Sequence, residues 1–144
     1  MPALLRLDEN SCRTLLRVNV VGRIGFVQDG TPRIVPVNYT MDGPDVVVAV
    51  DPTSELGRVV TGSDPAVPPM VVFEIDHIDQ DRHQGWSVTV TGPLERVLQP
   101  ASTPRPWADG VRAMLVRVSA YRVAGRRLGT DWGRPDDQPV LRQP

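Results

Sequence analysis

Two histidines lie among aspartates in the middle of the chain, and this group comes nearest to the residue types of a metal site. His77 and His83 are accompanied by Asp76, Asp79 and Asp81. Their spacing matches no common ligand pattern. The sequence also lacks the G-x-S-x-G motif of a serine nucleophile. We therefore predict neither a bound metal nor a side-chain nucleophile, and no catalytic side chain is assigned.

Two other segments carry groups that could contact a ligand. Pro36 lies in an apolar stretch that Asn38 interrupts. Because proline has no N–H to donate, Pro36 predicts a break in strand pairing, which leaves neighbouring backbone groups free to bind a planar heterocycle. Trp86 directly follows Gly85 at a strand start. It is interpreted either as a hydrophobic residue at a barrel lip or as a cofactor contact.

The charged residues give no sign of a nucleic-acid or lipid surface. All 16 basic residues are arginines, and the formal net charge is −1. The lack of lysine excludes a lysine Schiff base and a lysine phosphate clamp. Gly125-Arg126-Arg127 is either an anion-binding group or a solvated strand end. No apolar run approaches about 20 residues, so a soluble cytoplasmic protein is expected.

The elements that must position these residues are mostly strands. Hydrophobic residues make up 40% of the chain and aromatic residues only 5%, so the core must be aliphatic, and valine favours strands. Alternation and turn residues predict strands over 23–28, 33–41, 45–50, 70–78, 86–98 and 113–123. Short helices are expected over 9–18 and 55–61, with a helical turn at 107–109. Cys12, the only cysteine, is expected to be buried and inert in the first helix.

This order of elements predicts a mainly β (α+β) domain, a six-stranded antiparallel Greek-key barrel with two or three short helices. The domain should span residues 1–128, followed by a tail over 129–144 that lacks periodicity. Asp29-Gly30 predicts a tight hairpin turn. Gly92-Pro93 predicts a bulge or bend in the middle of a long strand. Open sheet edges and an aliphatic exterior favour a homodimer.

The segments GRIGFVQDGTPRIVPVNY and GWSVTVTGPLERV, with the apolar-Phe-Glu-apolar-Asp strand between them and the closing GRR, resemble a known family. They are similar to the pyridoxamine 5'-phosphate oxidase-like FMN-binding split barrels. The subgroup that they resemble comprises small bacterial members related to nitroimidazole-resistance proteins and flavin or deazaflavin reductases. The resemblance covers about residues 11–127 and implies a homodimer with two FMN sites at its interface.

The resemblance also implies a set of cofactor-binding residues. One strand would run beside the isoalloxazine ring, Ser54 would bind the phosphate, and Val50 lies where the family often has threonine near the phosphate. The residues implied to contact the cofactor are Pro36, Val37, Asn38, Val50, Ser54, Arg58, Trp86 and Ser87.

One position departs from the family pattern. Glu55 stands where the family usually has lysine or arginine on the phosphate. A carboxylate there repels a phosphate dianion, and Arg58, one helical turn after Ser54, is the expected substitute. The resemblance therefore implies weak binding of FMN.

Three functions remain open at this point. The first is an FMN-dependent oxidoreductase acting on a small molecule, and the second is a reductase that uses the deazaflavin F420. The third is a non-catalytic split barrel that has lost flavin binding, which Glu55 and Val50 favour. The colour of the purified protein separates them.

Overall fold

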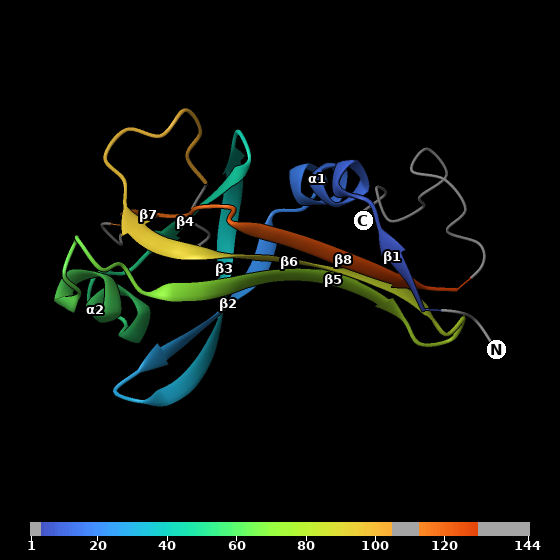
Figure 1. Ribbon diagram of the computed structural model, residues 1–144, viewed down its shortest axis with the longest axis horizontal. Helices are drawn as coiled ribbons and strands as arrows, with labels where there is room; N and C mark the ends of the chain where they lie inside the picture. The colour runs from blue at the N-terminus through green and yellow to red at the C-terminus, as the bar shows by residue number, and fades with distance from the viewer. Residues whose placement is uncertain (1–3, 105–112, 130–144) are drawn as a thin grey trace.

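Six antiparallel strands close into a barrel, and the pairing of β6 with β7 completes the circle (Figure 1). The computed structural model describes residues 4–104 and 113–129. Around the barrel the strands are β2 (Val21–Gln28), β3 (Thr31–Asp42), β4 (Asp45–Val50), β7 (Met114–Val118), β6 (Gln84–Arg96) and β5 (Met70–Asp79). Beyond β6 the sheet continues through β8 (Arg122–Leu128) and β1 (Leu4–Leu7).

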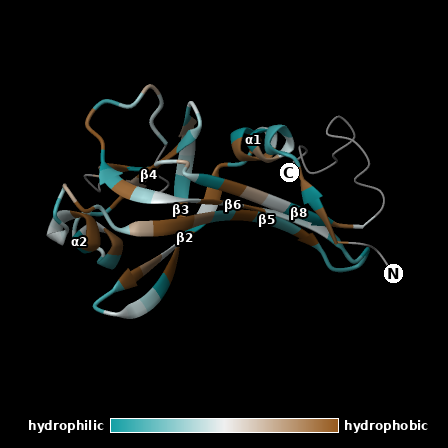
Figure 2. Cartoon of the chain, in the orientation of Figure 1, coloured by the Kyte–Doolittle hydropathy of each residue, from teal (hydrophilic) through white to brown (hydrophobic). Residues whose placement is uncertain are grey.

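The barrel interior is filled by the alternate residues of each strand. Side chains along a strand point in turn to its two faces, so a period-two hydrophobic pattern buries one face. Along β5 the buried positions are Val71, Phe73 and Ile75, with more exposed residues between them. Figure 2 shows hydrophobic and hydrophilic bands alternating along the strands. As the composition predicts, the core is dominated by valine.

β6 is the long strand that belongs to both halves of the fold. It pairs with β8 as far as Thr91 and with β7 from Leu94 onward. Gly92 and Pro93 lie at the changeover, where the Ser119 amide donates to the Pro93 carbonyl oxygen at 3.2 Å. The bend that was predicted at Gly92-Pro93 is therefore the point at which the strand leaves one partner for the next.

The predicted hairpin turn between β2 and β3 is confirmed. Asp29 and Gly30 have φ angles of 49° and 76°, the left-handed values that a two-residue turn of this class requires. The turn fixes the register of Gln28 with Thr31 and hence of the whole β2–β3 pair.

The first helix, α1 (Glu9–Val18), covers the interior side of the sheet and ends where it was predicted to end. Asp8 caps it by accepting a hydrogen bond from the Ser11 amide at 2.7 Å. Cys12 is 1% exposed and belongs to the core that α1 shares with the barrel. The expected burial of Cys12 is confirmed, and burial raises the pKa of its thiol.

The second helix, α2 (Glu55–Gly62), is held close to the loop that precedes it. A Cβ atom at Gly57 would lie 2.2 Å from the Asp51 carbonyl oxygen, so only glycine permits this approach. Ser54 is its N-cap, since the hydroxyl oxygen accepts a hydrogen bond from the Gly57 amide at 3.1 Å.

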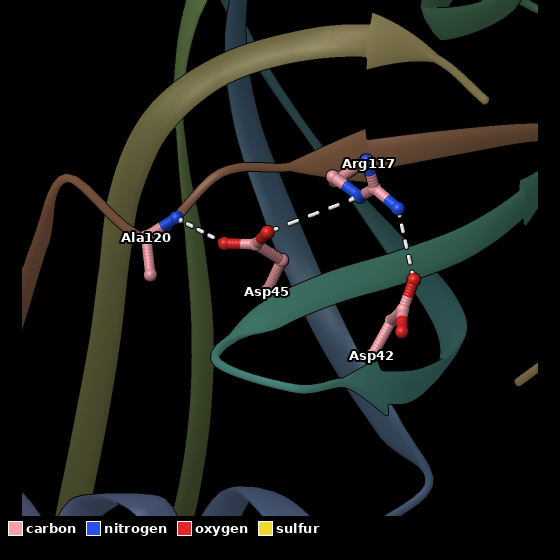
Figure 3. Close-up of polar contacts among 4 residues, drawn as sticks. All are labelled: Asp42, Asp45, Arg117 and Ala120. Atoms are coloured by element: carbon pink, nitrogen blue, oxygen red, sulfur yellow. Dashed lines mark hydrogen bonds and ion pairs between the residues drawn. The ribbon is translucent and has the colours of Figure 1, made fainter. Parts of the chain in front are cut away.

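A charged cluster joins the turn between β3 and β4 to β7 (Figure 3). Arg117 donates from Nη2 to Asp42 Oδ2 at 2.8 Å, and its Nε lies 3.9 Å from Asp45 Oδ2. The other oxygen of Asp45 accepts the Ala120 amide at 2.9 Å. These contacts link segments 75 residues apart and hold the break between β7 and β8.

The strand count differs from the prediction in two places. The single strand expected over 113–123 is two strands, because β7 and β8 pair with different partners on either side of residues 119–121. Leu4–Leu7 forms β1, which the sequence analysis missed. The helical turn predicted at 107–109 and most of the predicted tail lie outside the described residues. Within the described ranges, no helix is long and apolar enough to span a membrane.

Candidate functional site

Three of the predicted cofactor-binding residues lie on one face of the sheet, which we call the outer face. It is the side of β3, β2, β5, β6 and β8 that points away from the barrel interior. The register across it reads Pro36, Arg23, Glu74, Thr89 and Ala124. Asn38 and Ser87 are each two residues from a member of this row, so they share its face. The fold therefore places Pro36, Asn38 and Ser87 on the same face, with β2 and β5 between the strands that carry them.

Val37 and Trp86 face the other way. Val37 is 9% exposed and Trp86 only 2%, and both belong to the hydrophobic core. The expectation that Trp86 lies outside the core is therefore wrong for this chain, while its contact with a cofactor stays a prediction. Trp86 and Val88 are two residues apart on β6 and therefore share a face, and Val88 is fully buried. Within the described residues its indole Nε1 is buried and has no hydrogen-bond partner.

The remaining predicted residues lie around the N-terminus of α2. Val50 ends β4 and is 6% exposed. Ser54 uses its hydroxyl within the chain, because it donates to the Asp51 carbonyl oxygen at 2.6 Å as well as capping α2. Arg58 is exposed in the first turns of α2. In Figure 1, α2 and the turn between β5 and β6 lie at opposite ends of the molecule, so one chain does not bring Ser54 and Ser87 together.

The structure gives Glu55 a partner that the sequence analysis did not foresee. Arg33 of β3 reaches the start of α2, and its Nε lies 3.7 Å from Glu55 Oε2. Both side chains are about half exposed, at 46% and 49%, so the pair adds little to stability. Its consequence is electrostatic: the carboxylate expected to repel a phosphate is offset by a nearby guanidinium group.

A second cluster of charges lies in the middle of the outer face. Arg23 Nη1 is 3.3 Å from Asp76 Oδ2 and 3.5 Å from Glu74 Oε1. A single guanidinium group thus forms ion pairs with two carboxylates. Burial, followed by the neighbouring Asp76 carboxyl, raises the pKa of Glu74 from 4.5 to about 7, and Arg23 opposes this only in part. Glu74 can therefore hold a proton on the outer face near neutral pH.

The raised pKa of Glu74 predicts a pH dependence of stability. Between about 4.5 and 7 the folded protein binds a proton that the unfolded chain has released, so the free energy of unfolding should fall as pH rises through this range. Above it, the loss is complete. Urea unfolding of Glu74→Gln should show a shallower fall than the unchanged protein between about pH 5 and about pH 8.

The matched control for this measurement is Glu95→Gln, which removes an exposed carboxylate from the end of β6. It should follow the pH profile of the unchanged protein. Equal slopes for Glu74→Gln and the unchanged protein would show that Glu74 titrates normally.

Metal-ligating side chains do not gather within residues 4–104 and 113–129. No group of three or more histidine, cysteine, aspartate or glutamate side chains there could hold a metal ion. His83, with a φ of 51°, lies in the turn between β5 and β6. His77 is opposite Trp86 on β5.

Comparison of the sequence with known proteins gives two findings. A family model described as pyridoxamine 5'-phosphate oxidase matches residues 8–127. An uncharacterized protein of Mycobacterium tuberculosis is 30% identical over 138 residues, which cover 91% of this chain and 90% of that protein.

Solved structures share the fold. The FAD-binding protein from Mycobacterium smegmatis is 28% identical with a TM-score of 0.66, covering 87% of this chain and 98% of that one. A putative 5-nitroimidazole antibiotic resistance protein from Bacteroides thetaiotaomicron has a TM-score of 0.65 at 12% identity, covering 90% of each chain. The second likeness concerns the fold alone.

Proposed function

Because the chain belongs to the pyridoxamine 5'-phosphate oxidase family, we propose that it is a flavin-binding split-barrel protein and acts as an oxidoreductase. The family match covers most of the chain. The FAD-binding Mycobacterium smegmatis protein shares its fold at 28% identity. FMN is the flavin proposed here, and FAD and F420 are the competing cofactors.

The observation that carries this proposal is the outer face. Pro36, Asn38 and Ser87 lie on it together, across four adjacent strands. Pro36 has no N–H, and in the register of β2 with β3 it faces Arg23. A planar ring lying along β3 would meet exposed Pro36 and the half-buried side chain of Asn38.

The start of α2 suits a phosphate group through cations. Arg58 is exposed there, and Arg33 is brought to the same helix end by its contact with Glu55. Guanidinium groups match phosphate oxygens, and the N-terminus of a helix favours an anion. Ser54 is already hydrogen-bonded as a cap, so its share in holding the phosphate is small.

A homodimer is part of this proposal. α2 and the turn before β6 lie at opposite ends of the molecule in Figure 1, and Ser87 is near the start of β6. A single flavin that contacts both therefore requires α2 of one copy and β6 of another. Light scattering should give twice the mass of the 15.8 kDa chain, and a monomer at micromolar concentration would contradict this part.

The chemistry would come from the cofactor. A bound flavin supplies hydride transfer, and the protein supplies position and electrostatics. The chain's own residues would orient the ring along β3, and Glu74 would hold a proton at its carboxyl on the same face. A protein that leaves the chemistry to its cofactor needs no side-chain nucleophile, and none was predicted from the sequence.

The test is the cofactor itself. The purified protein should absorb near ~450 nm and release flavin on denaturation, and mass spectrometry of the released compound distinguishes FMN, FAD and F420. A colourless protein that binds none of the three on titration would overturn the proposal.

A prediction at Glu55 locates the phosphate. Glu55→Lys removes a negative charge and adds a positive one at the N-terminal turn of α2, so FMN should bind more tightly by ~1 kcal/mol or more. Flavin fluorescence titration measures this. Riboflavin, which lacks the phosphate, should bind the variant and the unchanged protein alike.

A charge-matched control completes the experiment. Glu95→Lys makes the same change in net charge at the end of β6 and should leave the affinity for FMN unaltered. Unchanged or weaker FMN binding by Glu55→Lys would place the phosphate elsewhere.

A non-catalytic barrel is the second candidate function. Val50, buried at the end of β4, offers no hydroxyl, and the hydroxyl of Ser54 is engaged within the chain. Both features reduce the polar contacts available to a phosphate. A folded dimer that binds no flavin would favour this candidate.

A further inference from the structure

Three arginines share one corner of the outer face. Arg6 of β1 is directly opposite Arg126 of β8 in the register. Arg122 is four residues before Arg126 on the same strand, so it points to the same side. All three are exposed. Three guanidinium groups from two neighbouring strands therefore lie along one stretch of this face, between Arg122 and Arg126.

This arrangement carries an electrostatic cost that a bound anion would relieve. Like charges directly opposite each other on paired strands are destabilising. Within residues 4–104 and 113–129, none of the three arginines forms an ion pair with a carboxylate. Other arginines of the chain do have such partners, namely Arg13, Arg23, Arg33, Arg82 and Arg117.

The three arginines line a groove of about 530 Å³. Its other side is formed by Ser87 and Thr89 of β6, and Ala124 of β8 lies between Arg122 and Arg126. The small side chain of Ala124 leaves room between the arginines. The Thr89 hydroxyl donates to the Ala124 carbonyl oxygen at 3.5 Å, so the donors left around this space are the three guanidinium groups and the Ser87 hydroxyl.

A second, apolar hollow of about 630 Å³ adjoins the first. Leu4, Ile78 and Leu128 line it, and Leu4 and Ile78 are 59% and 63% exposed. Ser87 and Arg126 line both spaces, so the two hollows lie next to each other there. Each volume lies within the range that ligand sites in proteins occupy.

The lining of the apolar hollow also includes a carboxylate, that of Asp79. It accepts a hydrogen bond from the Arg82 amide at 3.0 Å and lies 3.9 Å from the Arg82 guanidinium group. Its charge is thus offset by a neighbour outside the arginine groove.

We propose that the two hollows together bind an amphipathic organic anion. Its carboxylate, sulfonate or phosphate head contacts Arg6, Arg122 and Arg126, and its apolar body lies against Leu4, Ile78 and Leu128. The binding stands on these charges and surfaces alone. One part of this proposal rests on the proposed function: the ligand is the substrate of the flavin site, because Ser87 lines both sites.

The experiment uses the full-length protein and three probes in isothermal titration calorimetry. Naphthalene-2-sulfonate carries both the head and the body, inorganic sulfate only the head, and naphthalene-2-sulfonamide only the body. At low salt the sulfonate should bind at least about tenfold more tightly than either half-probe. Equal binding of the sulfonamide, or of sulfate, would overturn the proposal.

Matched variants locate the site. Arg126→Ala should weaken sulfonate binding by about tenfold or more, and Leu128→Ser should weaken the sulfonate but not sulfate. Arg17→Ala removes the same charge from the exposed end of α1 and should bind like the unchanged protein. Equal losses in Arg17→Ala and Arg126→Ala would overturn the assignment.

The flavin absorbance of the same samples separates this proposal from the previous one. A colourless protein that binds the sulfonate through Arg126 supports the anion site while contradicting flavin binding. A yellow protein that does not bind the sulfonate supports flavin binding and overturns the anion site.

Discussion

Replacing Gly92 with alanine is expected to destabilise the protein by about 3 kcal/mol or more, because overpacking of a buried strand bend forces the backbone to move. A Cβ atom at Gly92 would lie 1.6 Å from the Ser119 carbonyl oxygen and 2.8 Å from its carbonyl carbon. Both atoms are backbone, so no side-chain rotation relieves the contact. The break between β7 and β8 would have to shift, together with the hydrogen bonds that hold it to β6.

Urea unfolding of Gly92→Ala measures this effect, and Gly62→Ala is the matched control. Gly62 ends α2, and nothing lies within 4 Å of a Cβ atom there. Alanine in a helix is favoured over glycine, so this control should be neutral or stabilising by up to about 1 kcal/mol. A Gly92→Ala protein as stable as the unchanged one would show that the β6 bend is not tightly packed.

The bend at Gly92 was predictable from the sequence because its signal is local. Gly-Pro within a strand pattern indicates a bend whatever lies around it. The Asp29-Gly30 turn and the cap residues of both helices are local signals of the same kind. For this reason α1 has the predicted bounds.

The elements that the sequence analysis missed depend on distant partners. Leu4–Leu7 is a strand only because β8 offers it an edge. Residues 113–123 have a continuous β pattern, yet Ser119 and Tyr121 are bonded to β6 near its bend. That contact divides β7 from β8, and no short-range pattern records it.

The sequence names candidate cofactor residues but does not assign each side chain to a face of the sheet. Trp86 and Ser87 were assigned to the cofactor together, although neighbours on a strand point to opposite sides. The register needed to decide between them comes from β5 and β8. Ion pairs were equally unpredictable from the sequence, because the contacts of Arg33 with Glu55 and of Arg23 with Asp76 join residues far apart in the chain.

Trp86→Ala is expected to show on which face this side chain acts. Trp86 is 2% exposed within the core, so its truncation should cost about 3–5 kcal/mol of stability. Because the side chain belongs to the hydrophobic core, flavin affinity per folded molecule should change little. Ser87→Ala, one residue along the strand, should do the reverse: stability nearly unchanged, with weaker flavin binding.

A second variant, Trp86→Phe, tests the role of the indole Nε1 of Trp86, which has no hydrogen-bond partner within the described residues. A buried N–H without a partner costs about 1–3 kcal/mol, so phenylalanine loses packing but removes that cost. We expect Trp86→Phe to be much more stable than Trp86→Ala and close to the unchanged protein in urea unfolding. This variant remains measurable even where Trp86→Ala does not fold. A Trp86→Phe protein with full stability but lost flavin binding would mean that the indole N–H serves the cofactor, and the interior role assigned here would be wrong.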